Sequence, residues 1–181
     1  TGDSRGLSTS STSTLAPIAT TNNTYQRLTD RPLEDTQPTI ANGATETMVL
    51  WSGHRETASA TAGRDIAYQI ETSNGWSETT YLTTESLSHE APDAAVSDEA
   101  ILAAWEYVTT EIDEQTDVAD LHSHVEIAYA LYDGESWTDP TVLTASENRE
   151  FQPTVAPTAD GWVVVWEQST DPSPGSGQRN V

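Results

Sequence analysis

The chain has 181 residues and is strongly acidic: 29 Asp and Glu residues stand against 7 Arg and no Lys, a formal net charge of −22 at pH 7. Binding to nucleic-acid phosphates needs clustered cations, so this charge argues against a nucleic-acid partner. The absence of cysteine excludes a disulfide framework and thiol chemistry, and no apolar run approaches the roughly 20 residues of a membrane span.

The acidity has two interpretations. High charge with a hydrophobic content of 35 % is compatible with disorder, but six Trp and six Tyr at regular intervals argue for a folded chain. Dense carboxylates also keep a protein hydrated and soluble where salt screens charge repulsion. We therefore expect a halophilic source and a solvated acidic surface that can gather monovalent or divalent cations, with no other cofactor.

The chain divides into a linker and a repeating region. Residues 1–23 are rich in Ser and Thr and lack apolar periodicity, which predicts a linker or stalk. From residue 24 onward the sequence repeats. Two tryptophans, Trp76 and Trp137, are 61 residues apart, and so are Pro92 and Pro153, the last two of three recurring prolines. Each of these prolines precedes a tryptophan by thirteen residues, in the pairs Pro38–Trp51, Pro92–Trp105 and Pro153–Trp166.

Each repeat contains four short runs with strand character. In the first complete unit they are "PTIA", "TMVLW", "DIAYQIE" and "SETTYLT", separated by Gly, Asn and Asp residues that favour turns. Four antiparallel strands repeated every 40 to 60 residues are typical of a β-propeller blade, whereas an immunoglobulin-like sandwich needs about 100 residues and seven strands. The predicted fold class is all-β, made of propeller blades of four antiparallel strands.

The repeat also predicts where blades begin and end. Residues 24–29 match a fourth strand without its blade, one blade spans 38–83, a second spans 92–144, and a half blade spans 153–181. About 2.5 blades cannot close a ring of four or more. We therefore expect the remainder of the propeller in the same polypeptide or in a second subunit, because an open blade face and an unpaired strand edge favour association. An open stack of 2.5 blades is the alternative.

The unit "IAYALYDGESWTDPTVLT…QPTVAPTADGWVVVW" resembles the sialidase-like superfamily of propellers, including bacterial neuraminidase repeats, in a halophilic, haloarchaeal form. The resemblance covers residues 25–181 and implies the fold more than the function. The superfamily's Asp-box reads Ser/Thr-x-Asp-x-Gly-x-Thr-Trp, and the run from Asp133 to Trp137 is a shortened variant of it. In that family the box is a structural turn, so the resemblance implies that Asp133 is a turn residue.

Five residues are candidates for ligand binding. Sialidases hold a carboxylate with three arginines and use a Tyr-Glu nucleophile pair with an Asp acid/base; that set is not reproduced here, and we assign no catalytic residue. Loops on a rigid scaffold often carry function. In a propeller the loops from the second to the third strand and from one blade to the next share one face, and the candidates fall in these loops or at the start of a blade. Pairing of each arginine with one of the many carboxylates is the alternative. The candidates are Arg31, Arg55, Arg64, His89 and Arg149.

A metal site is a weaker hypothesis. His122, His124 and Glu126 are spaced so that a strand would place them on one face, and imidazole with carboxylate suits a transition metal. A loop over half of that run would separate them.

Function is predicted from the fold by analogy, which is weak support. We expect a non-catalytic, extracellular or cell-surface propeller segment that serves as a scaffold or recognition module and can meet a glycan. The alternative is a sialidase-like glycoside hydrolase or polysaccharide lyase whose main catalytic residues lie outside this chain.

Overall fold

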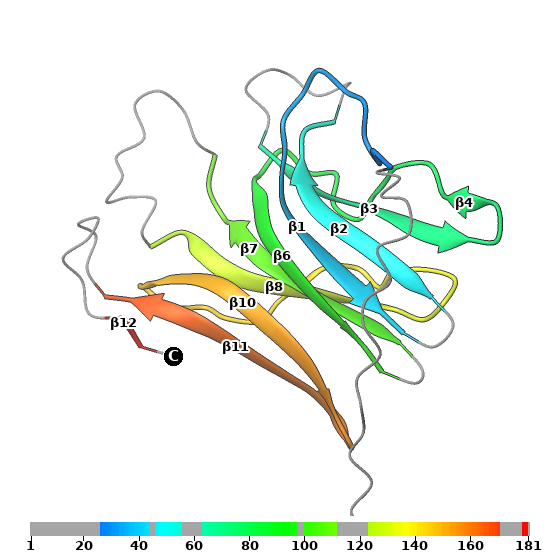
Figure 1. Ribbon diagram of the computed structural model, residues 1–181. Helices are drawn as coiled ribbons and strands as arrows, with labels where there is room; N and C mark the ends of the chain where they lie inside the picture. Colours follow the sequence, from blue (N-terminus) through cyan, green and yellow to red (C-terminus); the bar gives the residue numbers. More distant parts are fainter. Residues whose placement is uncertain are drawn as a thin grey trace, which may run out of the picture.

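The computed structural model describes residues 26–43, 46–55, 63–97, 100–111, 123–170 and 179–180. All regular structure in these ranges is β-strand, arranged in three antiparallel sheets that are stacked side by side in Figure 1. This arrangement confirms the predicted all-β fold with antiparallel blades. Within the described part of the chain, no helix is long and apolar enough to cross a membrane.

The first sheet is the most complete. Its strands are β1 (Asp35–Asn42), β2 (Thr47–Gly53) and β3 (Asp65–Thr72), paired in sequence order. The fourth position is divided between β4 (Gly75–Trp76) and β5 (Thr80–Tyr81), and both pair with β3. This is the meander expected for the first blade, with its outer strand interrupted.

The second sheet repeats the pattern. It consists of β6 (His89–Val96), β7 (Ile101–Val108), β8 (Val125–Tyr132) and β9 (Thr141–Val142), again paired in sequence order. Trp137 packs edge-on against Tyr68 of the first sheet, with ring centroids 5.8 Å apart. Trp137 therefore packs between two neighbouring sheets.

The third sheet holds the start of another blade. Strands β10 (Arg149–Thr158) and β11 (Gly161–Ser169) form a long hairpin, and β12 (Arg179–Asn180) pairs with β11. Within the described residues this sheet therefore has three strands.

The predicted fourth strand at residues 24–29 does not appear in its described part. Residues 26–29 have no strand assignment. A strand at this position would need the third strand of a preceding blade as its ladder partner, and the described residues do not supply one. Instead, the Leu28 carbonyl accepts a 3.4 Å hydrogen bond from the side-chain amide of Gln69 on β3.

A β-bulge recurs in the first strand of each of the three sheets, at the residue that precedes the recurring proline. Gln37, Ala91 and Gln152 have φ values of 53°, 49° and 51°, and the pairing register shifts at each of them. Two of these bulges are held by the preceding sheet: the Ala91 N–H donates to Ser52 Oγ (3.1 Å) and the Gln152 N–H to Glu106 Oε1 (3.0 Å). The bulges therefore fasten consecutive sheets together.

The core lies between sheets, not within them. Met48, Leu50 and Ile66 of the first sheet are buried against Trp105 and other residues of the second. A second cluster joins the second and third sheets and contains Leu102, Ala104, Ile127 and Val155. Each sheet thus needs a neighbour to bury its face, as stacked repeats do.

Candidate functional site

The residue that opens the first strand of each sheet, or comes next to it, accepts a hydrogen bond from a tryptophan indole. Each acceptor stands three residues before a proline, and each tryptophan follows its acceptor by sixteen residues. The acceptor chemistry changes from sheet to sheet: a carboxylate, an imidazole, then a carboxylate. The donor–acceptor distances are 3.0 Å for Trp51 Nε1–Asp35 Oδ1, 2.8 Å for Trp105 Nε1–His89 Nδ1 and 2.6 Å for Trp166 Nε1–Glu150 Oε2.

A further side chain, four residues upstream, contacts each acceptor. Arg31 pairs with Asp35, Glu85 Oε2 lies 2.8 Å from His89 Nε2, and Ser146 Oγ donates to Glu150 Oε1 at 2.7 Å. We call each trio a strand-start cluster; the three are Arg31–Asp35–Trp51, Glu85–His89–Trp105 and Ser146–Glu150–Trp166.

The middle strand-start cluster holds a neutral histidine. His89 is 2 % exposed, and its ring stacks on Tyr107 with centroids 4.9 Å apart. Because Nδ1 accepts the Trp105 N–H, the ring proton belongs on Nε2, which lies 2.8 Å from Glu85 Oε2. Burial lowers the pKa of His89, and the Glu85 carboxylate opposes this only in part. The predicted ligand-binding imidazole is therefore occupied by the chain's own side chains.

Arg31 and Arg55 are likewise paired internally. Arg31 binds Asp35, Tyr81 Oη and the His54 carbonyl. The Arg55 Nε lies 2.5 Å from Asp65 Oδ2, and its NH2 group donates to the Thr84 and Glu85 carbonyls. Burial raises the pKa of Asp65 more than Arg55 lowers it.

The other two predicted arginines also contact carboxylates. Arg64 binds Glu34 Oε2 at 2.7 Å and Thr36 Oγ1 at 2.8 Å. Arg149 lies 3.3 Å from Glu106 Oε2 and sits over the Phe151 ring, 4.9 Å from its centroid. Pairing with the chain's own carboxylates, the alternative that the sequence left open, is what the structure has at all four arginines.

Only part of the predicted set comes together in one place. Arg31 and Arg55 both line a pocket of about 520 Å3 beside β3 and β5. Arg64, His89 and Arg149 do not line this pocket. His89 and Arg149 also lie on first strands of different sheets, β6 and β10.

The metal hypothesis gains no geometric support among the described residues. His122 lies outside them. Glu126 points into the interior, where its oxygens accept from Thr144 Oγ1 (2.5 Å) and the Ser146 N–H (2.9 Å). His124 Nδ1 is 3.2 Å from Ser123 Oγ. Within the ranges that the structure describes, no three potential ligands gather as a metal would require.

Sequence reasoning missed the buried carboxylates. Glu106 and Glu150 are both buried, and Glu106 has a raised pKa because its burial outweighs its contacts with Gln152 and Arg149. A positional signal was available: Glu150 stands three residues before a proline, and Glu106 directly follows a tryptophan.

No protein-family model matches the sequence, and a comparison with curated proteins finds no match. Solved structures do show similarity in fold. The α-L-arabinofuranosidase from Lactobacillus brevis aligns with a TM-score of 0.58 and 9 % identity, over 82 % of this chain and 50 % of its own. A thermostable family-43 glycoside hydrolase gives 0.54 and 14 %, over 84 % and 54 %.

The Trypanosoma rangeli sialidase in complex with sialic acid gives a TM-score of 0.50 and 12 % identity, over 81 % of this chain and 31 % of its own. At these identities the similarity shows the fold, a β-propeller. The chain spans about half the length of the first two structures that it matches.

Proposed function

We propose that this chain is a non-catalytic segment of a carbohydrate-related β-propeller that serves as a scaffold or recognition module. The observation that carries the proposal is the internal occupation of its polar groups. Each arginine whose side chain is described pairs with a carboxylate of the same chain, and each strand start is held by an indole.

A glycoside-cleaving centre would need a different arrangement. A general acid or base has to reach the substrate within hydrogen-bond distance. Glu150 instead is buried and receives hydrogen bonds from Ser146, Trp166 and Gln168. Asp35 is similarly engaged by Arg31 and Trp51. These carboxylates stabilise the start of each sheet, which supports a scaffold role.

The proposed partner is the remainder of the propeller, in the same polypeptide or in a second subunit. On the third sheet, Val163 and Val165 are 43 % and 44 % exposed, whereas Leu102 and Ala104, which occupy the same positions in the second sheet, are buried under the third. At the opposite end, Ile40 is 60 % exposed. A further blade on each of these faces would bury these side chains.

A second candidate is a glycoside hydrolase or polysaccharide lyase whose catalytic residues lie outside this chain. It is favoured by two of the fold neighbours, an arabinofuranosidase and a family-43 glycoside hydrolase. An extracellular or cell-surface location in a halophile belongs to the same proposal and is supported by the net charge of −22 and by the Ser/Thr-rich residues 1–23.

Native mass measurement in high salt, followed by glycosidase assays on the purified assembly, tests both candidates. We expect the 19.6 kDa chain to be found within a larger assembly, with no turnover of arabinofuranosides or sialosides. Turnover that is unaffected by Glu150→Gln and Asp35→Asn would favour the second candidate. Turnover that these substitutions abolish, in variants that still assemble, would overturn the non-catalytic proposal.

A further inference from the structure

A Leu-Thr dipeptide fastens the outer part of the first sheet to the start of its third strand. The Leu82 N–H donates to the Ile66 carbonyl at 2.8 Å. Thr83 Oγ1 accepts the Ile66 N–H at 2.9 Å, and the same hydroxyl donates to Asp65 Oδ1 at 3.2 Å. We call this arrangement the Leu-Thr clasp. Its partner is an acidic residue followed by isoleucine at the beginning of β3.

The second sheet contains the same clasp. The Leu143 N–H donates to the Ile127 carbonyl at 2.7 Å. Thr144 Oγ1 accepts the Ile127 N–H at 2.8 Å and donates to Glu126 Oε2 at 2.5 Å. The contact is therefore a repeated device of the fold, and it requires an acceptor side chain at one fixed position of a third strand.

Leu28 and Thr29 form a third Leu-Thr dipeptide, which stands ten residues before Pro38 as the other two stand before their prolines. Thr29 is half-buried, so its hydroxyl is open to a partner. Among the residues that the structure describes, nothing forms a hydrogen bond with this hydroxyl. The dipeptide thus has the sequence and the spacing of a clasp without the third strand that a clasp needs.

The dipeptide already lies where a preceding sheet would put its outer strand. The Leu28 carbonyl accepts a hydrogen bond from Gln69 on β3. In the second sheet Ala130 has the register position of Gln69, and Leu82 packs against the core cluster that contains Ala130. Leu28 therefore meets the first sheet at the position where Leu82 meets the second.

The third sheet presents the matching acceptor position. Its third strand, β12, places Asn180 opposite Gln168. The acceptors of the two clasps have the same register position, in the pairs Asp65–Gly53 and Glu126–Tyr107. In all three pairs the second residue follows the recurring tryptophan by two positions. Within the described residues no strand pairs with the outer side of β12, and an asparagine oxygen can accept from a hydroxyl group as a carboxylate does.

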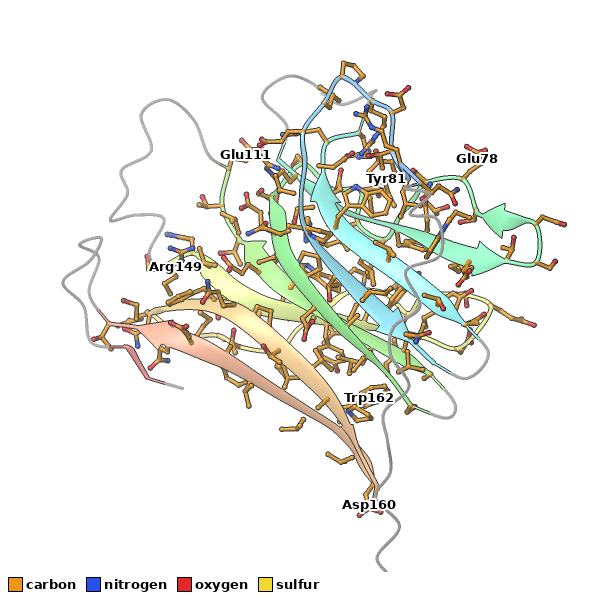
Figure 2. All side chains as sticks on the ribbon, viewed as in Figure 1. Glu78, Tyr81, Glu111, Arg149, Asp160 and Trp162 are labelled. Carbon is orange, nitrogen blue, oxygen red and sulfur yellow. The ribbon has the colours of Figure 1, made fainter. Side chains whose placement is uncertain are left out.

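The two halves of this contact lie at opposite ends of the stack of sheets. Figure 2 shows Tyr81, in the outer part of the first sheet, well away from Arg149 at the start of the third. Leu28 contacts the first sheet, Asn180 belongs to the third, and the second sheet packs between these two. The halves therefore cannot meet within one copy of the chain.

We propose that a second copy of this chain is the partner, and that Leu28 and Thr29 of one copy form a Leu-Thr clasp on β12 of the other, with the Thr29 hydroxyl donating to the Asn180 side-chain oxygen. The inference rests on the proposed partner role and names the second subunit. The same contact brings the exposed Ile40 of one copy toward the exposed Val163 and Val165 of the other.

Two copies also fit the number of sheets that a ring needs. Each copy contributes three sheets, and a total of about six is within the four to eight blades of closed propellers. A head-to-tail contact forms a ring when its rotation closes. The chain spans about half the length of the arabinofuranosidase and of the family-43 glycoside hydrolase, so a pair supplies a comparable length of chain.

Native mass and sedimentation of the whole chain in high salt provide the first test. We expect a mass of twice 19.6 kDa for the wild type. Thr29→Val should weaken self-association by about tenfold because the hydroxyl contacts are lost, whereas Thr29→Ser retains the hydroxyl and should associate as the wild type does. The matched control is Thr80→Val, at an exposed threonine of β5, which should leave self-association unchanged.

Cross-linking provides a second test that does not depend on the stability of one variant, because the chain has no cysteine of its own. Chains with Thr29→Cys and chains with Asn180→Cys are mixed under mild oxidation. We expect the mixed disulfide to exceed either symmetric one, since only the mixed pair meets at the contact. Asp30→Cys, at the exposed neighbouring residue, replaces Thr29→Cys in the control and should link to Asn180→Cys much less.

The proposal is overturned if the native mass is that of a single chain, if Thr29→Val associates as the wild type does, or if Asp30→Cys forms the mixed disulfide as readily as Thr29→Cys. Assembly with a different chain would overturn it as well and would leave the proposed function intact. Turnover that Glu150→Gln abolishes would overturn the non-catalytic function without affecting the contact between copies.

Discussion

The indole N–H of Trp105 donates a 2.8 Å hydrogen bond to Nδ1 of His89, so this buried imidazole is held as a neutral acceptor. The equivalent indoles of the other two sheets donate to carboxylates, Asp35 and Glu150. The same donor thus serves two acceptor types, carboxylate and imidazole, at the same place in the repeat. The middle strand-start cluster differs from the other two because protonation of its acceptor would remove the lone pair that the indole uses.

The folded protein should lose stability as the pH falls from about 6.5, the ordinary value for histidine. Burial lowers the pKa of His89 in the folded state, so over this window the unfolded chain binds the proton and the folded chain does not. The free energy contributed by neutral His89 is complete above the unfolded pKa and is lost toward the lowered folded pKa. Urea unfolding at pH 7.5 and pH 5.5 measures the loss.

His89→Gln should flatten this pH dependence, because glutamine can accept the Trp105 N–H without titrating in this range. The raised pKa values of Asp65 and Glu106 act with the opposite sign and are shared by both proteins, so the difference between them isolates His89. Equal pH slopes for wild type and variant would show that His89 does not control stability here.

Replacing Glu106 with leucine should destabilise the junction of the second and third sheets by about 2–3 kcal/mol, because the Gln152 N–H would lose its acceptor and Arg149 its partner. Glu106→Gln retains an acceptor oxygen and should cost less. Thermal unfolding of both variants, with Glu147→Leu at an exposed position as the control, measures the difference. Equal melting temperatures for all three variants would argue against a role for Glu106 at this junction.

Ala91→Gly should stabilise the protein by about 0.5–1 kcal/mol or leave it unchanged. Ala91 has a φ of 49°, a left-handed conformation that costs an L-residue roughly 1–2 kcal/mol, and glycine adopts it without that cost. The gain is partly offset because glycine has more freedom in the unfolded chain. The same substitution at Ala95, within β6 and without a positive φ, is the control and should be destabilising. A marked loss of stability in Ala91→Gly would contradict this account of the bulge.

The carboxyl group of Asp133 should titrate below its ordinary range in the folded protein. Its Oδ1 accepts the N–H groups of Ser136 (2.8 Å) and Glu135 (2.9 Å), and these contacts lower its pKa. The two amide proton signals should shift together with a midpoint below about pH 3.9. Asp133→Ala should abolish the coordinated shift, while Asp139→Ala, outside the turn, should preserve it. A midpoint at the ordinary value would show that the turn does not hold the carboxylate.

The arrangement of sheets follows directly from the spacing of large residues. Pro38 and Trp51 predict a first strand, a turn and a second strand, because each sheet must present the same profile to its neighbours. The observed hairpin β1–β2 fits this spacing, and so do the two that follow it. Spacing could not predict that residues 26–29 lack strand pairing, since a ladder depends on a partner strand and not on local pattern.

Site chemistry was harder to predict because the repeat conserves position without conserving residue type. Asp35, His89 and Glu150 are three different residues, two carboxylates and an imidazole, yet all accept an indole N–H. The arginines were singled out by charge alone, and charge does not reveal that Arg149 would meet Glu106, 43 residues away. Gln69 gave no signal in the sequence, because nothing in its residue type marks it as buried on β3.

The two hydrogen bonds that hold the bulges have the same direction: the acceptor belongs to the preceding sheet and the donor to the following one. The side-chain oxygens of Ser52 and Glu106 each accept a hydrogen bond from a backbone N–H of the following sheet. Each sheet thus supplies the acceptor that its successor's bulge needs, so the order of the sheets along the chain is also the order in which one supports the next.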